Sequence, residues 1–288
     1  MKISLACPTL AGAVLTAALC VTASSRANEF AWLADNMVQV AAHRMDLIPL
    51  PGPSSQPLMA YLARPDEPGR HQAVIVLHGC GGFGPSHVAI ADVLRSFGYV
   101  ALALGSLGEF NACSGRGADG ALAEAFDAYA ALDWLAQQSY VDADRVALIG
   151  FSMGGAATLD AVEPGLIEDK KPRHFRAAIA YYPWCKDRSG LTTVPTLILV
   201  GEKDDWTHAS WCQDMMARRD GKGAPVKLIV YPGATHGFNG PAPPREYLGH
   251  HLEYDGEATA DAWAQLRGFL HERLGAPEAT DHGGNRHP

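Results

Sequence analysis

The chain has 288 residues, of which 48% are hydrophobic and 19% charged, and its formal net charge at pH 7 is −8. This length and apolar content suit one well-packed domain of the larger kind and argue against a disordered protein. The acidic balance, without any cluster of Lys or Arg, argues against nucleic acid and anionic membrane surfaces as partners.

The first 27 residues have the features of a cleaved signal peptide. Lys2 gives a positive start, an apolar stretch runs from about residue 10 to residue 21, and Ser25-Arg26-Ala27 fits a small-x-small cleavage site. The apolar run is short for a membrane anchor. We therefore expect an exported protein, periplasmic or secreted, whose mature chain is not inserted in a membrane. Its folded domain is expected over residues 28–275, followed by a disordered tail over 276–288.

Apolar runs alternate with helical patterns along the rest of the chain. Short apolar runs predict strands at residues 57–63, 73–77, 99–104, 146–150, 177–182, 196–200 and 226–231, the first of them at a sheet edge. Amphipathic spacing predicts helices at residues 88–97, 119–138, 153–162 and 258–274. This order predicts an α/β fold with a mainly parallel central sheet and helices on both faces.

A serine between glycines follows one of the predicted strands. In "LIGFSMGG", Ser152 lies between a strand and a helix, with Gly150 and Gly154 two residues to either side. A sharp strand–serine–helix turn exposes the hydroxyl above the end of a helix, and its neighbours must lack bulk. The motif alone also suits a glycine-rich structural turn, but the flanking strand and helix favour a nucleophile elbow.

An acid and a histidine follow two later strands. Asp204 lies in "GEKDDWT" and His236 in "YPGATHGFN", each just past a predicted strand. The order Ser152, Asp204, His236 is typical of α/β-hydrolases, in which the acid orients the histidine and the histidine takes the serine proton. Asp205 is an immediate rival of Asp204. The double histidine at 250–251 lacks the spacing of a helical metal site.

Acyl transfer also needs amide donors for the oxyanion. The amide of Met153 follows the serine directly and is the first candidate. The glycine-rich turn in "VLHGCGGFGP" is expected to supply the second donor, the amide of Cys80. A phosphate-binding loop is disfavoured, because the turn has no Gly-Lys-Ser/Thr ending and no G-x-G-x-x-G.

Four cysteines remain after the leader, and four aromatic residues lie in or beside the site loops. An even number of cysteines in an exported chain suggests disulfides, and of the three possible pairings we favour Cys80–Cys113 and Cys185–Cys212. Four buried thiols are the alternative. The aromatic residues are candidates for an apolar substrate pocket, or ordinary packing residues: Phe83, Trp184, Trp206 and Phe238. The stretch 237–256 is a candidate lid or site wall.

Several segments together resemble the dienelactone hydrolase family of α/β-hydrolases. They are "LHGCGG", "YVDADRVALIGFSMGG", "YYPWC", "GEKDDWT" and "YPGATHGFN", and the similarity spans about residues 73–274. The resemblance implies Ser152, Asp204 and His236 as the catalytic triad and favours Asp204 over Asp205. Dienelactone hydrolases proper carry a cysteine at the elbow, where this chain has Ser152. Relatives often have an Asp-Ser pair where this chain has Gly105-Ser106.

These observations predict a serine hydrolase that cleaves carboxylic esters through an acyl-enzyme and needs no metal or organic cofactor. Its partner is a small-molecule ester or lactone. A hydrolase of lactones or amides with the same triad is the first alternative. An exported binding protein that keeps the scaffold without the chemistry is the second. The oligomeric state and the natural substrate have no signal in the sequence.

Overall fold

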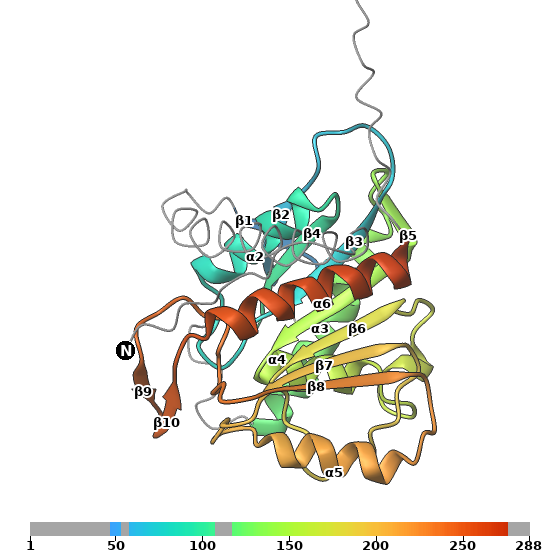
Figure 1. Ribbon diagram of the computed structural model, residues 1–288. Coiled ribbons are helices and arrows are strands. Elements are labelled where there is room, and N and C mark those ends of the chain that lie inside the picture. Colours follow the sequence, from blue (N-terminus) through green and yellow to red (C-terminus); the bar gives the residue numbers. More distant parts are fainter. Residues whose placement is uncertain (1–46, 53–57, 107–116, 276–288) are drawn as a thin grey trace, which may run out of the picture.

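The computed structural model describes residues 47–52, 58–106 and 117–275. The signal peptide prediction, the 276–288 tail and Cys113 lie outside these residues. The described part is built around an eight-stranded sheet, shown in Figure 1. Its strands, in spatial order, are β1 (Leu47–Leu50), β2 (Leu58–Ala63), β4 (Val100–Gly105), β3 (His71–Leu77), β5 (Val141–Phe151), β6 (Ala177–Tyr181), β7 (Thr196–Gly201) and β8 (Val226–Tyr231).

The sheet is parallel from β4 to β8, and β2 runs antiparallel to both of its neighbours. The α/β fold and the mainly parallel sheet predicted from the sequence are therefore correct. The helices are α2 (Pro85–Ser96), α3 (Gly117–Leu135), α4 (Met153–Ala161), α5 (Ala209–Arg219) and α6 (Gly256–Leu274), with a short 3₁₀ turn η1 (Glu168–Lys170).

Helices cover both faces of the sheet. Helices α2 and α6 pack on one face, against strand residues such as Val74 and Ile149. Helices α3 and α4 pack on the other face, against Ile75 and Leu148. Because successive side chains of a strand point to opposite faces, the apolar runs of β3 and β5 fill both cores at once. Figure 1 shows α6 crossing in front of the sheet, with α3 and α4 behind it.

Three features differ from the sequence prediction. The strand expected at an edge, β2, is not the edge, because β1 pairs along its outer side. Helix α5 was not predicted, since its sequence ASWCQDMMARR is polar overall and buries only four side chains, those of Ala209, Cys212, Met215 and Arg219. The stretch 237–256 contains a two-stranded hairpin, β9 (Arg245–Tyr247) and β10 (His250–Leu252), which lies apart from the main sheet (Figure 1).

This topology decides where functional groups meet. Strands β5, β7 and β8 are parallel and lie in the same half of the sheet, so their carboxyl ends share one edge. In open α/β sheets, that edge is where ligands bind. The loops after these three strands carry Ser152, Asp204 and His236.

Candidate active site

Ser152 lies at the turn between β5 and α4 with a left-handed backbone, φ 55° and ψ −111°. This conformation is strained for a residue with a side chain. The turn tolerates it because its neighbours are glycines. A Cβ on Gly150 would collide with the carbonyl of Gly154, and one on Gly154 would collide with the carbonyl of His78. The sequence therefore forms a tight elbow here, and Ser152 remains partly accessible at its top.

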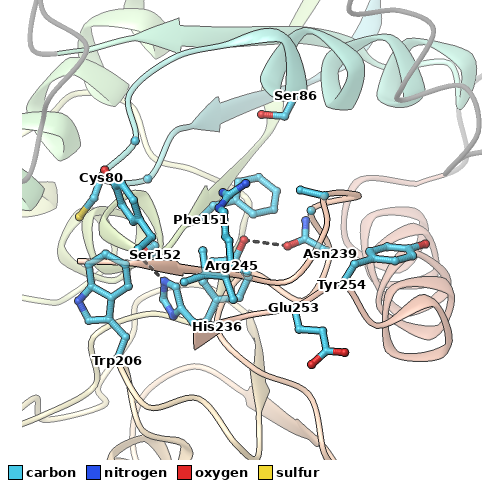
Figure 2. Close-up of a pocket in the computed structure, with 18 of the residues that line it drawn as sticks. Cys80, Ser86, Phe151, Ser152, Trp206, His236, Asn239, Arg245, Glu253 and Tyr254 are labelled. Atoms are coloured by element: carbon cyan, nitrogen blue, oxygen red, sulfur yellow. Dashed lines mark hydrogen bonds between the residues drawn. The ribbon is translucent and has the colours of Figure 1, made fainter. Parts of the chain in front are cut away.

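The structure brings Ser152, His236 and Asp204 into one hydrogen-bonded line. His236 Nε2 lies 2.9 Å from Ser152 Oγ (Figure 2). His236 Nδ1 lies 2.8 Å from Asp204 Oδ2. Asp204 and His236 are buried, with 2% and 3% of their surface exposed. A buried carboxylate on Nδ1 holds the proton on that nitrogen, which leaves Nε2 free to accept the serine proton.

Asp204 is itself held by the loop that follows it. Its Oδ1 accepts the backbone N–H groups of Trp206 (2.9 Å) and Thr207 (2.7 Å). The Thr207 hydroxyl lies 3.0 Å from Asp204 Oδ2 and 3.0 Å from the carbonyl of Tyr182. The Tyr182 ring packs against the His236 ring at 4.6 Å. Thr207 and Tyr182 were not singled out from the sequence, although Thr207 lies three residues after Asp204 and Tyr182 directly follows β6.

The two predicted oxyanion donors flank the serine. Met153 is the first residue of α4, so its amide has no partner within the helix. Cys80 follows β3 and lines the cavity that also contains Ser152. The two loops are joined by a hydrogen bond from the Gly154 amide to the His78 carbonyl, 3.0 Å long. Gly79 packs so closely that an added Cβ would lie 3.3 Å from the Ser152 Cβ.

A cavity of about 410 Å³ opens beside Ser152. Trp206 lines it, as predicted for a pocket residue, and packs on His236 at 4.9 Å and on His250 at 4.5 Å. Much of its remaining wall comes from the 237–256 stretch, which includes the β9–β10 hairpin. Figure 2 shows side chains of this stretch across the cavity from Cys80 and Ser86.

Three of the four aromatic residues proposed for the pocket do not line the cavity. Phe83 stacks on His87 at 5.7 Å, behind the wall. Trp184 is 43% exposed and packs on Trp211 of α5. Phe238 is fully buried in the core between the sheet and α6. Loop aromatics turn toward whichever apolar surface is nearest, so their nearness in sequence to His236 or Asp204 does not bring them to the substrate.

Two polar residues of the wall were not found from the sequence. Arg245, on β9, is exposed and lines the cavity, and its guanidinium makes no hydrogen bond or ion pair with any described residue. His87, on α2, accepts the Gly84 amide at Nδ1 over 3.1 Å, so its proton is on Nε2. Burial lowers the pKa of His87 to about 3, and the charge of nearby His78 adds to this, so His87 is neutral at physiological pH.

One of the two predicted disulfides, Cys185–Cys212, is present in the structure. Cys185 and Cys212 form a disulfide that closes a 27-residue separation and ties the loop after β6 to α5. Cys80 is also disulfide-bonded. Its predicted partner, Cys113, lies outside the described residues, so that pairing stays a prediction. Within those same residues, no three His, Cys, Asp or Glu side chains cluster as they would around a metal ion.

The sequence profile of the dienelactone hydrolase family matches residues 58–274, well over half of the chain. The chain belongs to the dienelactone hydrolase family. It is therefore a hydrolase, of the class that acts on carboxylic esters and lactones. None of the helices in the described ranges has the length and apolar character that crossing a membrane requires.

Similar proteins agree with this family membership. A probable 2-oxo-3-(5-oxofuran-2-ylidene)propanoate lactonase of Bradyrhizobium is 29% identical over 214 residues, which are 65% of this chain and 82% of the relative. A putative dienelactone hydrolase from Klebsiella pneumoniae has a similar structure, with 21% identity, 78% and 96% of the two chains covered and a TM-score of 0.62. Esterase 2 of Thermogutta terrifontis is 18% identical, with 81% and 97% coverage and a TM-score of 0.60. At these identities, the structures show a shared α/β-hydrolase fold.

Proposed function

We propose that this chain is an exported serine hydrolase that cleaves carboxylic esters through Ser152, His236 and Asp204. The observation that carries the proposal is the hydrogen-bonded line of these three side chains, with contacts of 2.9 Å and 2.8 Å, on a strained elbow beside an open cavity. A nucleophile within hydrogen-bond distance of a base, which a third group orients, is the arrangement that activates a serine hydroxyl.

In this mechanism, Ser152 Oγ attacks the ester carbonyl while His236 Nε2 takes its proton. The amides of Met153 and Cys80 stabilise the oxyanion of the tetrahedral intermediate. The C–O bond to the alcohol then breaks, and the alcohol leaves with the proton from His236. Water attacks the acyl-enzyme by the same route: His236 accepts a proton from the water and returns it to Ser152, and the carboxylic acid is released.

Export is supported by the leader-like first 27 residues and by the Cys185–Cys212 disulfide, because disulfides persist in oxidising compartments outside the cytosol. Cleavage after Ala27 would place Asn28 at the mature N-terminus. N-terminal sequencing of the protein recovered from the periplasm and the medium tests this, and an intact Met1 in the cytosol would contradict it.

The deciding test of the chemistry is reaction with a fluorophosphonate, beside the Ser152→Ala variant. We expect one adduct, which maps to Ser152 and is absent from the variant, and loss of turnover of short-chain esters in the variant without loss of folding. Retained esterase activity in Ser152→Ala would reject Ser152 as the nucleophile. Folded, oxidised wild-type protein that takes no adduct would favour a non-catalytic binding protein on this scaffold.

A lactone that carries a carboxylate is the second candidate substrate. Two observations favour it: the Bradyrhizobium relative is named as a lactonase of a propanoate, and Arg245 lines the cavity beside Ser152 with a guanidinium that pairs with none of the described residues (Figure 2). A guanidinium binds a carboxylate with two parallel hydrogen bonds. Kinetics of wild type and Arg245→Gln on matched neutral and carboxylate-bearing esters and lactones separate the candidates. A loss confined to the carboxylate-bearing substrates supports this role, and an equal loss on both contradicts it.

A further inference from the structure

A buried group of polar side chains lies directly behind the loop that carries Cys80. His78 directly follows β3, and neither His78 nor Glu124 of α3 has any exposed side-chain surface. His78 Nδ1 lies 3.6 Å from Glu124 Oε1. Neither carboxylate oxygen of Glu124 has a hydrogen-bond partner among the described residues. The hydrolytic mechanism uses neither side chain.

Both ring nitrogens of His78 face backbone carbonyls. Nδ1 lies 2.9 Å from the carbonyl oxygen of Gly79, and Nε2 lies 3.1 Å from that of Ser106. A neutral imidazole has only one N–H group, so it would turn a nitrogen lone pair toward one of these oxygens. An imidazolium donates to both. A buried imidazolium needs a counter-charge, and Glu124 is the carboxylate within reach.

Burial acts against charge on both His78 and Glu124, and the neighbouring histidine carries no charge. His87 of α2, whose ring centre is 6.1 Å away, is neutral because burial lowers its pKa to about 3. Burial raises the pKa of Glu124 well above its usual range, and Asp127 on the same helix adds to this. Burial lowers the pKa of His78, and its two carbonyl partners oppose that shift. Burial thus disfavours the charged form of both side chains, and the assignment of a second proton to His78 rests on the carbonyl oxygens that face both of its ring nitrogens.

The hydrogen bond to Gly79 bears on catalysis because a peptide unit is planar. The carbonyl of Gly79 and the N–H of Cys80 belong to the same trans peptide and point in opposite directions. When His78 holds the carbonyl oxygen, the Cys80 N–H is turned away from the His78 ring. His78 is also joined to the elbow, since its own carbonyl accepts the Gly154 amide.

We propose that Glu124 is a positioning residue of the oxyanion loop: it keeps His78 doubly protonated, and the imidazolium aims the Cys80 amide by holding the Gly79 carbonyl. This inference rests on the proposed function, in which the Cys80 amide is an oxyanion donor. Glu124 acts through His78 and touches no substrate.

The test compares Glu124→Gln, Glu124→Asp and Asp133→Asn with wild type. Glu124→Gln removes the counter-charge, so His78 loses a proton and one of its two carbonyl bonds. We expect kcat for a short-chain ester to fall roughly 10- to 100-fold with KM little changed, because the lost interaction is stronger in the transition state. Glu124→Asp keeps the charge and should recover part of kcat. Asp133→Asn is the control, a carboxylate of the same helix whose side chain is 45% exposed and whose removal should leave kcat unchanged.

Nuclear magnetic resonance of ¹⁵N-histidine-labelled wild-type protein gives a readout that does not depend on the variants. The His78 signals are assigned by their loss in His78→Gln. At a pH high enough for an exposed histidine to be neutral, we expect both ring nitrogens of His78 to carry a bonded proton. A neutral His78 in wild type, or a folded Glu124→Gln variant with wild-type kcat, would overturn the proposal. Failure of wild type to react with fluorophosphonate at Ser152 would instead reject the proposed function.

Discussion

Asp204 and Asp205 are neighbours in the chain with different surroundings. Asp204 is buried and accepts hydrogen bonds from His236 and from two backbone amides of its own loop. Asp205 is exposed, pairs with His250 at 3.4 Å and accepts the backbone amide of His251 at 3.2 Å. The side chain that orients His236 is therefore Asp204, and Asp205 joins the catalytic loop to the hairpin.

Replacing each aspartate with asparagine separates these roles. We expect Asp204→Asn to lower kcat for ester hydrolysis roughly 10³- to 10⁴-fold, because an amide favours the wrong tautomer of His236 and does not stabilise its imidazolium. Steady-state kinetics on one short-chain ester measures the effect. Asp205→Asn is the control of equal size and should leave kcat close to wild type; comparable losses in both variants would contradict the assignment.

At the scale of elements, the loops that carry the candidate active site are supported by packing outside the site. The Cys185–Cys212 disulfide ties the loop after β6 to α5, the helix that follows Trp206 and Thr207. Both cysteines are fully buried and pack with Leu159 of α4 and Ile198 of β7. The bond therefore joins the loop that carries Tyr182 to the helix that follows the Asp204 loop.

Removing this bond should weaken the fold more than the chemistry. A Cys185→Ser/Cys212→Ser double variant should lose about 3 kcal/mol of unfolding free energy, since the closed loop no longer restricts the unfolded chain. Urea denaturation of the oxidised wild type and the variant measures this. Because the hydrogen bonds of the triad do not involve either cysteine, kcat at 25 °C should be retained. An unchanged unfolding free energy would show that the bond does not stabilise the protein.

Elements with strong apolar patterns were predictable, and those without them were not. The buried strand β3 and the helix α3 stand where their sequences indicate. Strands β9 and β10 have three residues each and read as polar, so no periodicity marks them. The stretch 237–256 was expected as a candidate lid or site wall, and its residues do line the cavity, but the hairpin within it and the position of Arg245 were not predicted. The order of Ser152, Asp204 and His236 was visible, because it depends only on which strand each residue follows.

At the scale of the whole molecule, helix α3 buries two carboxyl groups against the sheet, those of Glu124 and Asp127. Asp127 is 6% exposed, and burial raises its pKa from 3.8 to about 6. A carboxyl with a raised native pKa binds its proton more tightly in the folded state than in the unfolded chain. Its contribution is therefore favourable at low pH and is lost as the pH rises from about 4 to about 6.

This sign predicts a pH-dependent stability difference. Asp127→Asn cannot ionise, so its unfolding free energy relative to wild type should increase with pH. The increase between pH 4 and pH 8 should reach up to about 3 kcal/mol, the equivalent of a shift of two pKa units. Chemical denaturation at both pH values measures it. Asp133→Asn on the exposed side of the same helix is the control, and a difference that does not vary with pH would contradict the prediction.

The elbow at Ser152 has a consequence for the exchange of nucleophiles in this family. Ser152 has its left-handed backbone at the junction of β5 and α4, and the space for this turn comes from Gly150 and Gly154. Any residue with a Cβ meets the same strain there, whatever atom it carries beyond the Cβ. The backbone strain at this position is therefore the same for serine and for cysteine. The two residues differ there only in the atom bonded to the Cβ, the oxygen or the sulfur nucleophile.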